Sequence, residues 1–243
     1  MKYLFSQISY LFFISILIQG KPLAIEYEFA SIEHLIEQEV GRIVLPQMYR
    51  NIGIDITITP LPAKRAQFLA NTGAKDGEIM RIETYGDENT HTIRVPTPYY
   101  YLETMPFILK GSNVDIHRKE DLSKYKLAKI RGVKHTNNIT KGLTNVYEMN
   151  STANMFRMLQ NEKVDVVLTN TLDGNLILEK LGYDNIVSIN NALAVLPLYH
   201  YIHEKNKALV PLIDQEILRL KKSGELKKLI KLAEQEVTKV NQR

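Results

Sequence analysis

The apolar residues in the first part of the chain alternate between helix spacing and strand spacing. After an extended start at 25–29, an amphipathic helix is predicted by apolar residues three or four positions apart: Ile32, Leu35, Ile36, Val40, Ile43 and Val44. Pro46 is expected to interrupt this helix or to restart it as a second segment. Strict alternation then predicts a strand over 54–58, followed by a helix over 62–72 and a strand over 78–80. This order of strands and helices predicts parallel pairing with right-handed crossovers.

The second part of the chain repeats the alternation. Before it, residues 93–110 are too broken for a helix and too long for one simple strand, which indicates a passage out of the first unit. Residues 132–138 are predicted to form a polar loop. The remaining pattern predicts a helix capped by Ser151, a helix over 172–181 ended by Gly182, and strands over 127–130, 147–149, 164–168 and 186–189.

The last part of the chain returns to the first unit. A strand from Ala194 to His203, and helical sequence from Lys207 with a stop at Gly224, complete that unit. No linker rich in Pro, Gly or Ser separates the halves, so the chain is expected to cross between two lobes twice. We therefore predict an α/β fold of two lobes, each a mostly parallel sheet flanked by helices, with two crossover strands. The predicted bounds are residues 25–105 and 193–243 for lobe 1 and residues 106–192 for lobe 2.

The first 24 residues have the pattern of a signal peptide. Lys2 precedes an apolar run from Ile8 to Ile18, which stays uncharged as far as Gly20, and the small residue Ala24 follows. A membrane-spanning helix needs about 20 apolar residues, and this run is shorter. The chain is therefore expected to be exported into the periplasm of a Gram-negative envelope, with an uncleaved anchor as the alternative.

Composition limits the partners. The chain has no cysteine, so it must be held together by packing rather than by disulfides. Its formal net charge of +4 is modest. The late lysines, such as Lys221, Lys227 and Lys231, alternate with leucines and have no aromatic residues among them, which is typical of a solvated helix face and not of a nucleic-acid-binding surface.

Three short motifs carry a resemblance to a known family. They are Pro62-Ala63-Lys64-Arg65-Ala66, Asp76-Gly77-Glu78-Ile79-Met80-Arg81 and Ile93-Arg94-Val95-Pro96-Thr97-Pro98. Their order resembles the first lobe of bacterial extracellular solute-binding proteins of family 3, the amino-acid-binding type of periplasmic binding protein. The resemblance implies the type II periplasmic-binding-protein fold and a monomer that captures a small polar solute, an amino acid or related carboxylate. The implied partner is an inner-membrane ABC permease or a sensor kinase, and no cofactor is implied.

The resemblance also implies where the ligand binds. In the family the Arg that corresponds to Arg81 clamps a ligand carboxylate, although Arg81 could instead pair with Glu83 or Asp87. An Asp that holds the ligand's ammonium group is replaced here by Asn170, which could also serve as a helix N-cap.

Two further segments complete the candidate ligand-binding set. Arg131 and Thr136 lie in a segment where the family presents backbone N–H groups to ligand carboxylates, and Lys134 in the same segment is expected to be solvated. An inward-pointing Arg131 or Lys134 would favour an acidic ligand. Tyr99 or Tyr100 is expected near the cleft, as the aromatic residue that packs on the ligand.

Other chemistries have little support in the sequence. His200 and His203 would point to opposite faces of a strand, so we predict no metal site. The chain has no thiol, no Gly-x-Ser-x-Gly elbow, no His-Glu-x-x-His and no phosphate loop, and we predict that it is not an enzyme. The alternatives are a periplasmic lyase or dehydratase on the same fold, and an adaptor that acts only through protein contacts.

Overall fold

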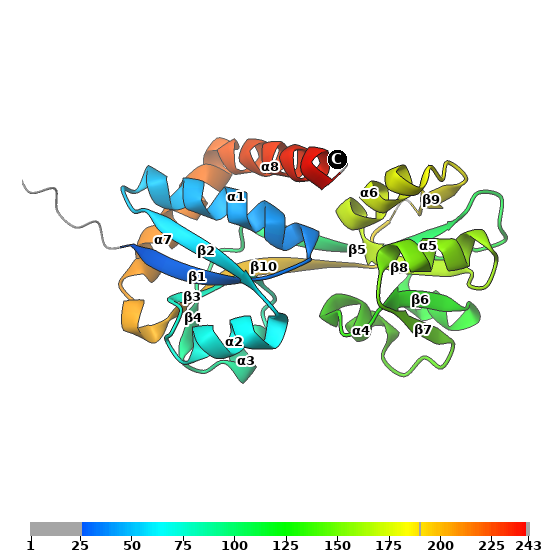
Figure 1. Cartoon of the computed structure of the whole chain (residues 1–243), viewed down its shortest axis with the longest axis horizontal. Coiled ribbons are helices and arrows are strands. Elements are labelled where there is room, and N and C mark those ends of the chain that lie inside the picture. Colours follow the sequence, from blue (N-terminus) through cyan, green and yellow to red (C-terminus); the bar gives the residue numbers. More distant parts are fainter. Residues whose placement is uncertain (1–25, 190, 242–243) are drawn as a thin grey trace, which may run out of the picture.

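The chain folds into two lobes that are joined by two long strands (Figure 1). The computed structural model describes residues 26–189 and 191–241, and the predicted leader lies outside them. The elements of lobe 1 are β1 (Tyr27–Ile32), α1 (Ile36–Asn51), β2 (Ile56–Leu61), α2 (Ala63–Asn71), β3 (Gly77–Arg81), α3 (Tyr85–Glu88), β4 (Thr92–Arg94), α7 (Leu209–Ser223) and α8 (Glu225–Asn241).

Lobe 2 lies between the two passages of the chain. Its elements are β6 (Leu127–Ile130), α4 (Lys134–Thr140), β7 (Val146–Met149), α5 (Thr152–Gln160), β8 (Val166–Asn170), α6 (Thr171–Leu181) and β9 (Ile186–Ser188). Short 3-10 helices lie at Lys119–Lys124 in lobe 2 and at Glu204–Asn206 in lobe 1.

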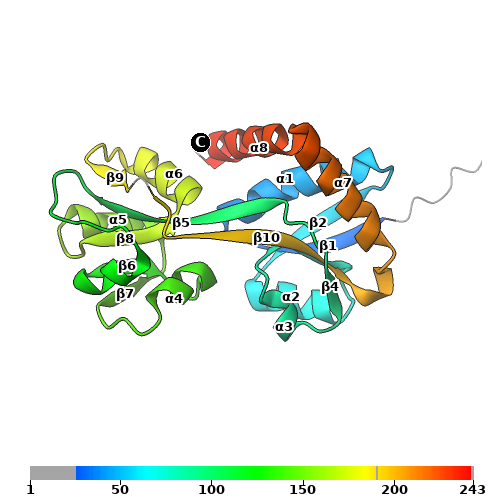
Figure 2. The same cartoon turned by 180° about the vertical axis from the view of Figure 1, so that it is seen from behind.

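The joining strands are β5 (Tyr100–Leu109) and β10 (Ala194–His203), and Figure 2 shows both running from one lobe into the other. They pair antiparallel, with Ala194 opposite Thr104 and Leu198 opposite Tyr100. β10 then pairs with β3 in lobe 1, and β5 pairs with β8 in lobe 2. The strand order is β2-β1-β3-β10-β5-β8-β6-β7, with β4 added to β10 and β9 added to β5. The sheets of the two lobes are therefore continuous through this one ladder.

Each lobe has its own apolar core. In lobe 1, α1 packs Val44 and Tyr49 against sheet residues such as Phe29 and Ile202, all of them fully buried. In lobe 2, Phe107 of β5 packs edge-on against Phe156 of α5, with ring centroids 5.3 Å apart. Each core removes a contiguous apolar surface from water, which is the main favourable term in folding.

The two-lobe α/β class is confirmed, and several predicted signals lie where expected. The strands over 127–130 and 194–203 have the predicted bounds. Ser151 caps α5, since its Oγ accepts a hydrogen bond from the backbone N–H of Asn154. Gly182 and Gly224 end α6 and α7 in the left-handed conformation that favours glycine.

Two predictions about local structure were wrong. Pro46 does not interrupt the first helix, because α1 continues through it to Asn51. The buried residues Val44, Leu45 and Met48 on either side of Pro46 anchor the helix to the core, and this packing offsets the loss of one backbone hydrogen bond. The polar loop expected over 132–138 instead contains most of α4, because a short polar segment lacks the periodicity that reveals a helix.

Within the described ranges, no helix combines the length and the apolar character needed to cross a membrane. The apolar run of the predicted leader lies outside those ranges.

The close approach of β3 to β10 yields a first testable prediction. Gly77 has a φ of +152°, and a Cβ atom built on it would overlap the backbone carbonyl oxygen of Tyr201. Gly77→Ala should therefore lower the free energy of unfolding by about 3 kcal/mol or more, because neither backbone can yield without breaking the ladder. Gly53→Ala is the matched control, since Gly53 also has a positive φ but has open space around it. The control should cost only about 1 kcal/mol. Equal costs in urea unfolding would contradict the role assigned to Gly77.

Candidate functional site

A cavity of about 300 Å³ lies between the two lobes. Lobe 1 contributes residues 34–37, at the start of α1. Lobe 2 contributes the ends of β6 and β8 and the first turns of α4, α5 and α6. Loops and helix starts at the carboxyl ends of strands are where open α/β sheets bind ligands. The cavity is therefore the candidate functional site.

Asn170 and Thr136 both line this cavity. Asn170 is the N-cap of α6, because its Oδ1 accepts a hydrogen bond of 2.8 Å from the backbone N–H of Asp173. The alternative interpretation of Asn170 as a helix cap therefore holds, while its position at the cavity also keeps it a candidate ligand-binding residue. The hydroxyl of Thr136 donates to the carbonyl oxygen of Val133, 3.1 Å away.

Two carboxylates line the cavity from opposite lobes, Glu37 of α1 and Asp173 of α6. Oδ2 of Asp173 accepts hydrogen bonds from the hydroxyls of Thr152, at 2.7 Å, and Thr169, at 2.8 Å. Glu37 is only 8% exposed. Burial raises the pKa of Glu37 from its usual 4.5 to about 7, and the negative charge of Asp173 also raises it.

A buried histidine completes the polar lining. Nδ1 of His135 hydrogen-bonds to the hydroxyl of Thr104 on the joining strand β5, at 2.7 Å. Burial lowers the pKa of His135 to about 4, so the imidazole is neutral at physiological pH. His135 therefore offers the cavity a hydrogen-bonding group without a charge.

Arg81 is not among the residues that line this cavity. It ends β3 as predicted, but it is 7% exposed and its Nη1 lies 3.3 Å from Oε1 of Glu78. Its guanidinium also stacks on the ring of Tyr85, 4.6 Å from the centroid. Glu83, one alternative partner that the sequence suggested, pairs with Arg94 instead. Arg81 is therefore held by lobe 1 itself in this structure.

The Glu78–Arg81 pair is buried on both sides. Glu78 is fully buried, and burial raises its pKa even though the charge of Arg81 lowers it. Among the residues that the structure describes, neither carboxylate oxygen of Glu78 has a partner with hydrogen-bond geometry, and Nε of Arg81 also lacks one. Removing one member of such a pair leaves an uncompensated charge in the protein interior.

The other candidate residues lie away from the cavity. Tyr99 is 1% exposed in the core of lobe 1, where its hydroxyl accepts a hydrogen bond from the backbone N–H of Met80. Tyr100 donates its hydroxyl hydrogen to Glu234 of α8, and its pKa is raised by burial, by Glu234 and also by the nearby charge of Glu37. Arg131 faces Glu148 on the surface of lobe 2, at 3.6 Å. The structure thus brings Thr136 and Asn170 together and leaves these three residues outside.

The lobes touch on both sides of the cavity. On one side, Leu172 and Leu176 of α6 join the core of lobe 1. On the other side, Nζ of Lys134 in α4 lies 3.2 Å from a carboxylate oxygen of Glu88 in α3. Both of these charged groups are substantially exposed, so their pair contributes little to stability. Lys134 therefore forms an exposed ion pair between the lobes and does not line the cavity.

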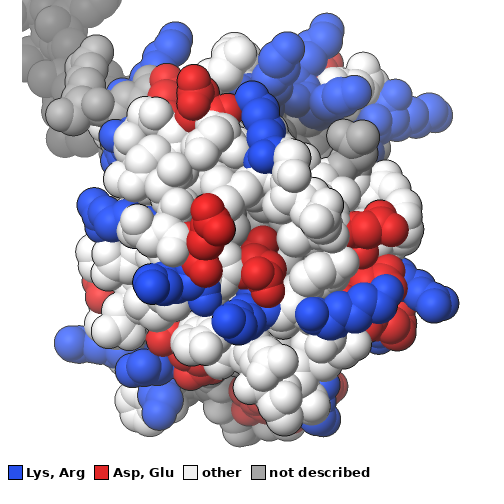
Figure 3. All heavy atoms as spheres, turned by 90° about the vertical axis from the view of Figure 1, so that its right-hand side faces the viewer, with Lys and Arg blue, Asp and Glu red and all other residues white. Residues whose placement is uncertain are grey.

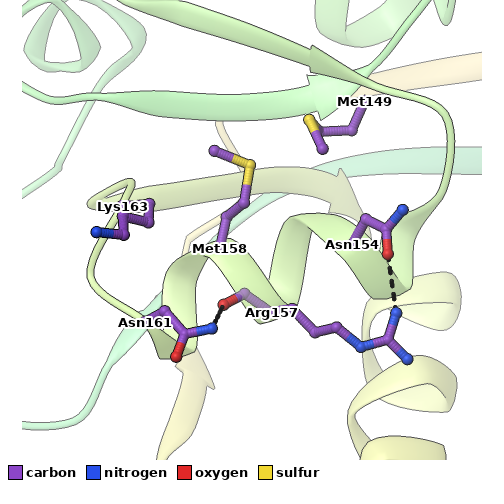
Figure 4. Close-up of a pocket in the computed structure, with 6 residues that line it drawn as sticks. All are labelled: Met149, Asn154, Arg157, Met158, Asn161 and Lys163. Carbon is purple, nitrogen blue, oxygen red and sulfur yellow. Dashed lines mark hydrogen bonds between the residues drawn. The ribbon is translucent and has the colours of Figure 1, made fainter.

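A second hollow lies on lobe 2 alone, along α5 (Figure 4). Met158 extends toward Met149, while Arg157 lies along the helix and donates a hydrogen bond to Asn154. The hollow is wide open to solvent and receives no residue from lobe 1. On the end of lobe 2 that Figure 3 shows, basic and acidic side chains are interspersed. This face offers no continuous basic track of the kind that nucleic acids need.

The histidines considered for metal binding lie in separate environments. His200 is fully buried and hydrogen-bonds to the hydroxyl of Tyr49 and to the carbonyl oxygen of Glu78. His203 accepts a hydrogen bond from the backbone N–H of Lys205 at the end of β10. In residues 26–189 and 191–241, no group of three or more His, Cys, Asp or Glu side chains is placed to hold a metal ion.

Sequence reasoning missed Glu37 and Asp173 as cavity residues. One signal was available, since both lie in the first turn of a helix that follows a strand. The same position is occupied by many acidic residues that merely complement the helix dipole. Only the three-dimensional approach of α1 to α6 distinguishes these two from the others.

Comparisons with known proteins support the fold. No protein-family model matches the chain. An uncharacterized protein of Shewanella oneidensis strain MR-1 is 22% identical over 214 residues, which cover 85% of this chain and 80% of that protein.

Solved structures of the same architecture resemble the chain at low sequence identity. The GluR0 ligand-binding core in complex with L-glutamate has a TM-score of 0.68 at 14% identity, covering 87% of this chain and 98% of that one. The substrate-binding protein of an amino acid ABC transporter has a TM-score of 0.60 at 17% identity, covering 84% and 97%. A histidine kinase sensor domain with similarity to periplasmic binding proteins has a TM-score of 0.62 at 14% identity, covering 84% and 94%. The chain therefore has the two-lobe α/β fold of type II periplasmic binding proteins.

The buried ion pair yields a second prediction. Arg81→Ala should lower the free energy of unfolding by about 3–5 kcal/mol, because Glu78 is left buried without its partner. Arg94→Ala is the matched control, since Arg94 also pairs with a glutamate and stacks on a tyrosine at 4.6 Å but is more exposed. The control should cost about 1 kcal/mol or less. Urea unfolding measures both, and equal small losses would refute the buried pair as a structural unit.

The raised pKa of Glu37 yields a third prediction. Between pH 4.5 and about 7 the folded protein holds the Glu37 proton that the unfolded chain releases. The contribution of Glu37 to stability is therefore full below pH 4.5 and is lost as the pH rises to about 7. Glu37→Gln should remove this loss, so the variant should gain in melting temperature over the wild type as the pH rises.

The measurement is thermal unfolding of the solute-free protein at several pH values across this window. His135 and His200, whose pKa values are lowered by burial, lose stability in the opposite direction, as the pH falls. Both histidines are present in wild type and variant, so their effect cancels in the difference. A difference in melting temperature that does not change with pH would contradict the assignment, and Glu39→Gln on the same helix is the control.

Proposed function

We propose that this chain is an exported solute-binding protein that captures a small polar solute between its two lobes. The observation that carries the proposal is the cavity between the lobes, which α1 of lobe 1 and the strand ends of lobe 2 line together. Its volume of about 300 Å³ suits a solute of small size. A solute held there touches both lobes at once, which couples its binding to their relative position.

The mechanism rests on the two strands that join the lobes. Rigid lobes on a narrow connection move as bodies by hinge rotation, with the change taken up at a few residues. A solute that contacts both lobes binds the closed form more tightly than the open form, so it shifts the population toward closure. Thr104 of β5 supports this coupling, because it hydrogen-bonds to His135 in the cavity lining.

The closed form is then available to a partner at the inner membrane. The proposed partner is the permease of an ATP-driven importer or a sensor kinase. Two structural neighbours are the substrate-binding protein of an amino acid ABC transporter and a histidine kinase sensor domain, so both kinds of partner are consistent with this fold. The periplasm is the proposed location, in keeping with the predicted leader.

Filling the cavity provides the fourth prediction. Ala153 lines the cavity in the first turn of α5, and Asn154 beside it is exposed outside the cavity. In a thermal-shift screen of amino acids, amines and small organic acids, the wild type should be stabilised by at least one solute. Ala153→Trp should abolish that shift because its side chain occupies the solute's volume.

Asn154→Trp, one position further along the same helix, should retain the shift. Circular dichroism checks that both variants are folded. An unchanged shift in a folded Ala153→Trp variant would place the solute elsewhere, and the absence of any shift in the wild type would count against the proposed function itself.

A further inference from the structure

The acidic side chains that line the cavity between the lobes are not accompanied there by lysine or arginine among the described residues. Glu37 and Asp173 both line it, and no Lys or Arg is among the described residues that do so. The remaining polar lining consists of hydroxyls, the amides of Asn150 and Asn170, the exposed imidazole of His34 and the uncharged imidazole of His135. A solute in this cavity therefore meets carboxylates from both lobes and, from the described residues, no lysine or arginine side chain.

Two basic residues close to the cavity in sequence or by their field, Arg81 and Lys134, already have acidic partners. Arg81 lies 3.3 Å from Glu78, and Lys134 lies 3.2 Å from Glu88. The field of Arg81 reaches Glu37 and lowers its pKa, but desolvation outweighs this effect. The charges of Glu37 and Asp173 are therefore not matched one for one by protein cations.

The buried carboxylate of Glu37 is a second observation that points to a ligand. Its side chain is more than nine-tenths buried, at 8% exposure, and it lines the cavity. Its carboxylate accepts a hydrogen bond from its own backbone N–H, and no other hydrogen bond or ion pair to it is seen among the described residues. A buried charge without a partner is costly, and proteins retain such groups mainly at sites where function needs them.

We propose that the solute carries an ammonium group, which binds between Glu37 of lobe 1 and Asp173 of lobe 2. This assignment rests on the proposed function and names the chemical class of its ligand. The hydroxyls of Thr152 and Thr169 hold Oδ2 of Asp173 and so orient the carboxylate. An ammonium group can donate hydrogen bonds to both carboxylates, and such charge-assisted bonds are the strong ones.

The position of the two carboxylates makes the ammonium group a signal for closure. In the empty protein at a pH above about 7, where Glu37 is ionised, the two like charges repel each other across the cleft and oppose the approach of the lobes. A cation between them replaces this repulsion by two attractions, one to each lobe. The solute thus changes the sign of the electrostatic contribution to closure, and a neutral molecule of the same shape does not.

The assignment also predicts how binding depends on pH. A bound ammonium group favours the ionised form of Glu37, so affinity should rise as the pH increases toward and through about 7. The titratable or charged groups around Glu37 that bear on this dependence are His34, Glu39, Arg81, Tyr100, His135 and Asp173. Glu37→Gln should flatten the rise, because it removes the group that releases the proton.

The fifth prediction uses a matched four-carbon series as probes. Putrescine carries two ammonium groups, γ-aminobutyrate carries one ammonium and one carboxylate, butanediol is neutral, and succinate carries two carboxylates. Calorimetric titration of the full mature chain should give affinities that fall in that order, with no measurable binding of succinate. Binding of butanediol or succinate at least as tight as that of putrescine overturns the ammonium assignment and leaves the proposed function standing.

Variants then test the two carboxylates themselves. Glu37→Gln and Asp173→Asn should each weaken putrescine binding by about ten- to a hundredfold. Glu39→Gln and Glu179→Gln make the same change of charge on α1 and α6 outside the cavity lining and should change the affinity by about twofold or less. Equal losses of putrescine affinity in all four variants would indicate only a general electrostatic effect of the protein's charge and would overturn the site.

One readout needs no solute. Small-angle scattering of the solute-free protein should show a more closed form in Asp173→Asn than in wild type, because one of the two repelling charges is gone. An unchanged or more open form overturns the electrostatic role in closure.

The thermal-shift screen separates the ligand class from the receptor function. If no amine stabilises the wild type and a solute without an ammonium group does, the ligand class is overturned but the receptor function is not. If no solute shifts the melting temperature of the wild type, the result counts against both the ligand class and the receptor function.

Discussion

The antiparallel pairing of β5 with β10 is the constraint on which the rest of the structure depends. This ladder belongs to both lobes, because β10 continues into pairing with β3 while β5 pairs with β8. The two strands then position candidate residues in each lobe, since β10 places Tyr199 opposite Arg81 of β3 and β5 places Thr104 opposite Asn170 of β8. The strand ends of lobe 2 can meet the start of α1 only because the chain passes between the lobes along these two paired strands. The cavity is a consequence of the ladder, and so is the hinge that we propose.

The charges in the cavity are tolerable because of where the helices begin. Glu37 and Asp173 each lie in the first turn of a helix, where the partial positive charge of the helix N-terminus favours a carboxylate. That contribution is small compared with the full cost of burying an unpaired charge. The rest of the free-energy cost of burying the charge appears as the raised pKa of Glu37. The folded protein avoids part of that cost by keeping Glu37 protonated. Sequence and fold are locally inconsistent here, which is typical of functional sites.

Much of the fold could be predicted because its signals are local. Ser151 reveals a helix start, Gly182 and Gly224 reveal helix ends, and the alternation over 194–203 reveals a strand. The predicted break at Pro46 was wrong because tertiary packing on both sides of Pro46 outweighs its local effect on the helix.

The site was less predictable because its members come together only in three dimensions. Asn170 and Thr136 were found through their positions after strands, whereas Tyr99 faces the core and Arg131 faces the surface. Arg81 was placed correctly at the end of β3, but its partner Glu78 lies only three positions before it on the same strand. A strand's alternation would put positions 78 and 81 on opposite faces. The left-handed backbone of Met80, at a φ of +50°, breaks that alternation. No sequence pattern predicts a left-handed conformation at a methionine.

The difference between the charge of the whole chain and the charge of its cavity constrains how a solute is captured. The full chain carries a formal net charge of +4, so its distant field does not attract a cation. That field is screened within about 8 Å at physiological ionic strength, while groups inside a cavity are screened much less. A cationic solute therefore gains little in association rate from the protein as a whole and gains its affinity only after it has entered between the lobes. Under the proposed assignment, selection takes place in the closing step, where Glu37 and Asp173 from opposite lobes act on the same group, and affinity is controlled chiefly by how slowly the closed form reopens.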